Sequence, residues 1–167
     1  MGFIYKPSSV TISAGTTIAT LDDSDLPGLG LGGLLAQSSI GAIFNGVNTS
    51  RVPLAVSFTE NSSGSEFTVV ANHLKSKSGT GTGADADQLD GQGNWQNQRE
   101  LAAEAVRQWI ATDPTGSGDA DVLLLGDFNS YLKEDTLDDV LIPGGYTNLA
   151  ASLPADDWTC NGFVPVA

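Results

Sequence analysis

Four polar side chains stand at the ends of apolar segments, and their types suit reaction with a phosphate ester. His73 lies near the end of EFTVVANHL, whereas Asp127 and Asn129 close DVLLLGDFN and Arg51 opens RVPLAVSF. A carboxylate can hold a divalent ion or activate water, and an amide can orient that water. Cationic donors can stabilise the charge that develops on phosphorus. The set therefore fits phosphoryl transfer to water.

The segments RVPLAVSF and EFTVVANHL are predicted to be two strands of a hairpin. The first alternates apolar and polar residues, as a strand with one buried face does. The second is apolar on both faces, which is typical of an interior strand. ENSSGS between them has the composition of a turn. A turn centred there places Phe58 opposite Glu66 and Arg51 opposite His73, with a possible slip of a residue or two.

The next elements are predicted to be a loop, a helix and a strand. Ser76–Gly93 is rich in Gly and Asp, as loops are. Asn97, with Glu100 three residues later, has the pattern of a capping box at a helix start. Asp113 and Pro114 end the helix. Its predicted apolar stripe consists of Leu101, Ala102, Ala105, Val106, Trp109 and Ile110.

This order predicts that the polar side chains meet at one edge of a sheet. A strand, a helix and a strand form a unit whose strands are parallel, so EFTVVANHL and the central-type strand DVLLLGDFN end together. That edge is where α/β sheets place ligands. Asp127 and Asn129, two residues apart, are expected to point the same way. The hairpin adds Arg51, and Lys75 and Lys77 follow closely.

Each candidate also has an ordinary structural interpretation. A histidine in an apolar strand is commonly a satisfied core residue. An Asp two residues before an Asn commonly closes an Asx turn. Arg51 by itself has the character of a surface charge. The meeting of three separate chain positions at one sheet edge favours the functional interpretation.

Length and composition indicate a single globular domain with an acidic surface. The chain has 167 residues, 40% of them hydrophobic, and a formal net charge of -13. This charge argues against sequence-independent docking on nucleic-acid phosphates and suits an exported protein or one that recruits divalent cations. No apolar run is long enough to cross a bilayer, and the segment after Met1 lacks the features of a secretory signal. Cys160 is interpreted as a passive thiol.

The first third of the chain carries weaker signals. Phe3–Tyr5 and Val10–Ile12 are short β-prone runs. The Gly/Leu-rich stretch Thr20–Gln37 is interpreted as a loop or an excursion at the rim of the domain. Its aspartates lack the spacing of a calcium-binding EF-hand loop and are interpreted as a solvated acidic turn. These aspartates are Asp22, Asp23 and Asp25.

The motifs NHLKSK and GDFNSY, with the long segment DQLDGQGNWQNQRELAAEAVRQWIATDPTGSGDADVLLL between them, resemble the endonuclease/exonuclease/phosphatase superfamily. The likeness is greatest to its bacterial extracellular nuclease branch, related to deoxyribonuclease I, and extends from GFIYKPSSV to GGYTNLAAS. It implies an α/β (α+β) fold, a two-sheet β-sandwich flanked by helices. It also implies a secreted hydrolase that cleaves phosphodiester bonds of DNA or RNA with Mg²⁺, or with Ca²⁺ or Mn²⁺.

The resemblance also implies roles for individual residues. His73 corresponds to the histidine that contacts the scissile phosphate, and Arg51 to an arginine that contacts phosphate. Asp127 and Asn129 correspond to the pair that orients the attacking water and helps to bind the metal. Arg99 belongs to the pattern of the extracellular branch, and we expect it to anchor the first helical turn to the preceding loop.

The chain departs from the family pattern at both ends. An initial strand bearing an Asn and the metal-binding Glu after it cannot be placed, and the final Asp-His pair is absent. Residues 1–167 are therefore expected to be one partial domain that lacks the first strands and the C-terminal segment. Two alternatives stay open: a catalytically silent or degenerate fragment, and a phosphodiesterase or phosphatase acting on phospholipid or inositol phosphate. No membrane partner is expected, and the oligomeric state is left open.

Overall fold

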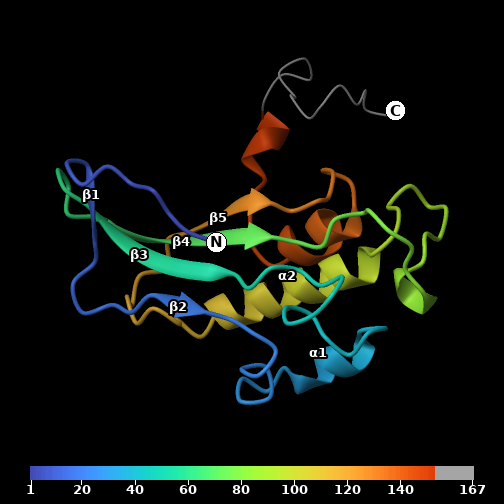
Figure 1. The fold of residues 1–167 in the computed structure, drawn as a ribbon. Helices are drawn as coiled ribbons and strands as arrows, with labels where there is room; N and C mark the ends of the chain where they lie inside the picture. Colours follow the sequence, from blue (N-terminus) through green and yellow to red (C-terminus); the bar gives the residue numbers. More distant parts are fainter. Residues whose placement is uncertain (153–167) are drawn as a thin grey trace.

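In the computed structural model, which describes residues 1–152, the strands form a single mixed sheet (Figure 1). The order is β1-β3-β4-β5, and β2 pairs with the start of β3, whereas β1 pairs with its end. A second sheet, expected from the resemblance, is not present in this part of the chain, and Cys160 lies outside it. The strands are β1 (Val10–Ile12), β2 (Ala19–Thr20), β3 (Leu54–Glu60), β4 (Glu66–His73) and β5 (Val122–Asp127). The helical elements are α1 (Gly32–Gln37), η1 (Gly83–Asp85), α2 (Gln96–Ile110), η2 (Thr136–Leu141) and η3 (Leu149–Ser152).

The predicted hairpin forms, with a register one residue away from the expected one. Thr59, rather than Phe58, lies opposite Glu66. The cause is the turn, in which the backbone N–H of Glu60 donates to the carbonyl of Ser65 over 2.8 Å. This bond joins the last residue of β3 to the residue just before β4, so fewer residues remain in the loop than the composition alone indicates.

The parallel pairing of β4 and β5 is confirmed, with Thr68 opposite Val122 at its start. β4 lies between β3 and β5, as its apolar composition predicts. β5 has the same composition but pairs only with β4 among the described residues. Leu123 and Leu125, whose side chains alternate with those of Val122 and Leu124 in the main core, are 43% and 50% exposed. The prediction that β5 is a central strand is therefore wrong for residues 1–152.

Helix α2 covers one face of the sheet and forms the main core with it (Figure 1). Every residue of its predicted apolar stripe is buried. On the opposite face, Val56, Phe58 and Val69 form a smaller cluster. Phe3 covers this cluster edge-on, 6.1 Å from the Phe58 ring, although Phe3–Tyr5 forms no strand. The sheet is thus well covered on one face and partly covered on the other.

The start of α2 differs from the predicted capping box. The residue before the helix is Trp95, in a left-handed conformation with φ 67° and without a side-chain cap, and Asn97 is already inside the helix. The carboxylate of Asp85, fully buried in η1, accepts the backbone N–H of Gln98 over 2.9 Å. A side chain distant in sequence thus satisfies the free N–H that a local cap would otherwise take. Glu100 instead accepts a side-chain amide within the helix.

The Gly/Leu-rich stretch is part of the core rather than an excursion at the rim. It contains α1, and Leu21, Leu26 and Leu31 are buried in the main cluster. Leucines spaced by glycines in this way carry no strand or helix period, so the sequence pattern hides their burial. The acidic turn is present, and the Asp23 carboxylate accepts backbone N–H groups from residues 43–45. No helix of the described residues has the length and apolar character needed to cross a membrane.

Candidate functional site

The four candidate residues converge at the carboxyl ends of β4 and β5. The backbone N–H of Arg51 donates to the carbonyl of His73, and that of Leu74 donates to the carbonyl of Asp127, both over 2.9 Å. The side-chain amide of Asn129 donates to the Leu74 carbonyl, also over 2.9 Å. Three chain segments are therefore joined within a few residues of one another, as the predicted topology requires.

His73 and Asp127 face each other at the last position of the parallel register. Nε2 of His73 lies 4.0 Å from Oδ2 of Asp127, which is too long for a hydrogen bond. The two side chains are 46% and 63% exposed. Both groups are therefore open to solvent and available to a ligand that approaches the sheet edge.

Asn129 is placed by a turn rather than by strand alternation. β5 ends at Asp127, and Asn129 follows with a positive φ of 49°. Its backbone N–H donates to Oδ1 of Asp127 over 2.9 Å, which is the Asx-turn geometry. The prediction that the two side chains point the same way as strand neighbours therefore rests on a wrong premise. The turn holds Asp127 in place, with its second oxygen toward His73.

Gly126, which the sequence argument did not single out, is required for this arrangement. Its φ is 125°, and a Cβ built there would lie 1.9 Å from the carbonyl oxygen of Asn72. Only glycine combines that backbone angle with so close an approach of β4 and β5. A glycine inside an otherwise apolar strand, directly before an aspartate, was the signal that could have revealed it.

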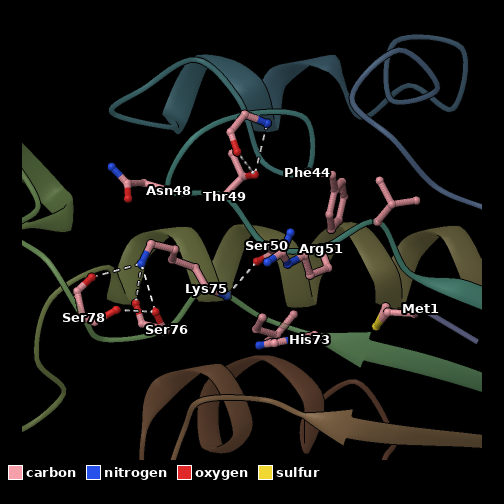
Figure 2. A pocket seen from close by; sticks show the side chains of 13 residues that line it. Met1, Phe44, Asn48, Thr49, Ser50, Arg51, His73, Lys75, Ser76 and Ser78 are labelled. Atoms are coloured by element: carbon pink, nitrogen blue, oxygen red, sulfur yellow. Dashed lines mark hydrogen bonds between the residues drawn. The ribbon is translucent and has the colours of Figure 1, made fainter.

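A cleft of about 760 Å³ opens beside these strand ends (Figure 2). Arg51, His73 and Lys75 line it, together with neutral residues. None of its 13 lining residues is Asp or Glu, although the chain has 20 acidic and seven basic residues. Asp127 and Asn129 are not among the lining residues. The cleft is consequently a positively charged region on an acidic protein.

Lys75 contributes a buried cation to the cleft (Figure 2). Its Nζ donates to the carbonyls of Ser76 and Ser78 over 2.7 and 3.1 Å, and lies 4.9 Å from the centre of the Trp95 ring. Burial, and secondarily the charge of Arg99, lowers the pKa of Lys75. Because these acceptors are neutral oxygens of Ser76 and Ser78, the contacts do not neutralise the charge of Lys75.

Two further basic residues serve the scaffold around the site. Arg99 is fully buried and donates to the carbonyls of Asn94 and Gln92, each over 2.8 Å. It therefore anchors the first turn of α2 to the preceding loop, as expected, and its burial lowers its pKa. Lys77 does not line the cleft but forms an ion pair with Glu134, a buried carboxylate that sequence reasoning missed.

The predicted metal ligands supply only part of a coordination shell. Among residues 1–152, no group of three or more His, Cys, Asp and Glu side chains is arranged to hold a cation. Asp127 offers one exposed carboxylate, and Asn129 offers one amide oxygen. Mg²⁺ commonly takes one or two carboxylates and completes its shell with water and phosphate oxygens. The donor set therefore fits a metal that a substrate phosphate helps to hold.

The sequence matches no protein-family model and none of the curated proteins with which it was compared. The structure is similar to the catalytic domain of human Nocturnin, at 15% identity and a TM-score of 0.47, over 78% of this chain and 34% of that one. It is also similar to an endonuclease/exonuclease/phosphatase family protein from Bacteroides thetaiotaomicron, at 15% identity and a TM-score of 0.47. That match covers 83% of this chain and 38% of the other. The chain thus spans well under half the length of either structure.

Proposed function

We propose that this chain is part of a metal-dependent phosphodiesterase whose substrate is a nucleic acid. The observation that supports this proposal most is the segregation of charge. Arg51, Lys75 and the single histidine of the chain line one cleft that contains no acidic residue. A cleft of this kind attracts an anion to a protein that otherwise repels it. A phosphodiester is also an anion whose hydrolysis the Asp127 carboxylate, next to His73, can assist by holding a divalent cation or a water molecule.

Each side chain has a step to perform in this proposal. The Arg51 guanidinium binds the phosphate and stabilises the negative charge that develops on it. His73 donates a hydrogen bond to a phosphate oxygen. Asp127, held by the backbone N–H of Asn129, orients a water molecule toward phosphorus. A divalent cation bound at Asp127, with Asn129, would polarise a phosphoryl oxygen.

We further propose that the chain derives from a secreted nuclease of the bacterial extracellular branch, with a deoxyribonuclease I-like two-sheet domain. The NHLKSK and GDFNSY motifs and the segment between them support this assignment. The acidic composition suits export and predicts weak binding to long nucleic acids unless divalent cations are present. Because the chain spans only part of such a domain, full activity is assigned to the longer protein.

The activity test is nicking of supercoiled plasmid by the purified chain in Mg²⁺, in EDTA, and after Asp127→Ala. We expect nicking in Mg²⁺, slower than that of the longer protein, that EDTA abolishes and that the substitution reduces at least about a hundredfold, as losses of catalytic groups do. Asp121→Ala, just before the other end of the same strand, is the matched control and should nick like wild type. Nicking that survives both EDTA and Asp127→Ala would exclude the proposed mechanism.

A second candidate is a domain that binds a phosphate ester without cleaving it. It is favoured by the single carboxylate that Asp127 offers to a metal. The two candidates differ in one measurement. Binding of inorganic phosphate, followed through the NMR signals of His73, combined with no nicking in Mg²⁺ would favour the silent domain.

A further inference from the structure

We propose that Glu134 is a positioning residue, which holds the segment leaving β4 and the segment leaving β5 in the spacing that the site needs. This inference rests on the proposed function. Within residues 1–152, the ion pairs of Glu134 are with Lys77 and Arg99 and not with a candidate site residue. It lies seven residues beyond Asp127 along the chain, and its partner Lys77 lies four residues beyond His73. The ion pair between them joins the segment that follows β4 to the segment that follows β5.

Glu134 is buried and sits between two cations. Its side chain is 6% exposed, and Oε1 forms the ion pair with Nζ of Lys77. Oε2 lies 3.9 Å from a terminal nitrogen of Arg99, whose side chain is completely buried. Nζ of Lys77 also lies 4.3 Å from the centre of the Tyr131 ring. A carboxylate in this place offsets two positive charges that would otherwise repel each other in a medium of low dielectric.

Asp135, the residue after Glu134, links the same two segments. Oδ2 of Asp135 accepts the side-chain amide of Gln92 over 2.7 Å, and the backbone N–H of Asp135 donates to the Gln92 amide oxygen over 2.9 Å. Lys77 lies near the start of the loop Ser76–Gly93, and Gln92 lies near its end. Two consecutive residues, Glu134 and Asp135, therefore hold both ends of that loop.

This loop also forms one side of the candidate site. Ser76 and Ser78 line the cleft and hold the Lys75 ammonium through their carbonyls. Asp127 lies at the start of the segment that leads to Glu134. Removing the Glu134 charge would leave Lys77 and Arg99 without their counter-ion and would loosen one side of the cleft against the other. Misplacement of reacting groups by about 1 Å can lower a rate a hundredfold.

The proposal is tested with Glu134→Gln, Lys77→Met and the double variant, using an activated phosphodiester in Mg²⁺ well below the melting temperature. We expect each single substitution to lower kcat about tenfold while KM changes less than threefold. The double variant should lose no more than Glu134→Gln alone, because the two single substitutions break the same ion pair. Lys77→Arg should restore most of kcat. The matched control is Arg107→Met, which breaks the surface pair with Glu104 on α2.

A second measurement does not depend on cleavage. His73 is the only histidine of the chain, so the NMR signals of its imidazole C–H groups are assigned without ambiguity. We expect these signals to move in Glu134→Gln and Lys77→Met and to stay in place in Arg107→Met. Unmoved signals, or variants with a lower melting temperature but wild-type kcat, would overturn the proposal. Moved signals in a chain that does not cleave would support positioning and count against the proposed activity alone.

Discussion

Polar and charged groups at the two ends of the β3–β4–β5 sheet differ in how far along the chain their partners lie. At the hairpin end, the turn after Glu60 satisfies its own polar groups. The Glu60 carboxylate accepts the backbone N–H groups of Ser62 and Ser63 over 3.1 and 2.7 Å. Hydrogen bonds from Ser63 and Ser62 hold the pKa of Glu60 at about 2. All of this chemistry lies within six consecutive residues.

At the site end, the partners come from distant parts of the chain. Asn129 donates to Leu74, and Lys77 pairs with Glu134. The guanidinium of Arg51 makes no hydrogen bond or ion pair with any residue from 1 to 152 that the structure describes. The Glu60 carboxylate at the hairpin end is thus occupied by its own turn, whereas the end built from distant segments retains the open guanidinium of Arg51 beside His73.

The largest expected effect is on the free energy of unfolding, when a glycine at each end of the sheet is replaced by alanine. Gly126→Ala should lower the free energy of unfolding by about 4 kcal/mol, because the new Cβ meets the Asn72 carbonyl and the φ of 125° is strained. Gly64→Ala in the hairpin turn should cost about 1 kcal/mol, since its φ is 76° but nothing lies within 4 Å of a Cβ. Urea unfolding measures both. Equal losses would contradict the close approach of β4 and β5.

An intermediate effect is expected from cations at the two ends. Arg51→Met should weaken binding of inorganic phosphate about tenfold, because one charge-assisted hydrogen bond is lost. Lys6→Met should leave binding unchanged, since Lys6 lies by the hairpin end, where Asn61 bonds to the adjacent Pro7. Titration followed by the NMR signals of His73 gives both dissociation constants. A similar loss in both variants would show that phosphate responds to net charge rather than to the cleft.

The smallest effect is expected from Glu60→Gln in pH-dependent unfolding. The pKa of Glu60 is about 2 in the folded protein against an ordinary 4.5, so its ionised form is favoured by folding. This stabilisation is complete above pH 4.5 and is lost as the pH falls toward 2. Wild type should therefore be more stable than the variant at pH 7, and the difference should vanish near pH 2. A difference that does not depend on pH would refute the assignment to the carboxylate charge.

The sequence predicts the hairpin, the parallel pair and α2 because each has a strong local period. The apolar stripe from Leu101 to Ile110 and the turn chemistry of ENSSGS are visible without a structure. The exact register was less accessible, since it depends on one backbone bond between Glu60 and Ser65. The burial of Leu21 and Leu26 was hidden, because glycine-spaced leucines show no period.

The residues of the candidate site and its surroundings likewise fall into those that the sequence could place and those that it could not. The sequence could bring Arg51, His73 and Asp127 together because His73 and Asp127 end recognisable strands and Arg51 precedes one. Glu134 and Asp85 could not, because an acidic residue in a loop carries no signal of burial until its partners are known. Asp85 replaces the local cap expected at Asn97, and only the tertiary structure shows it. Long-range polar contacts are the part of this molecule that local patterns do not encode.

The parallel pairing of β4 with β5 has a consequence for the order of folding. The hairpin closes over the short turn after Glu60, whereas pairing of β5 with β4 closes the long stretch of chain between Thr68 and Val122, which contains α2. Closing the longer loop costs more entropy, and contacts between distant residues slow folding. We therefore expect the hairpin to form early and the candidate site to be assembled among the last steps. A nascent or partly folded chain would then have its hairpin before Asp127 lies beside His73.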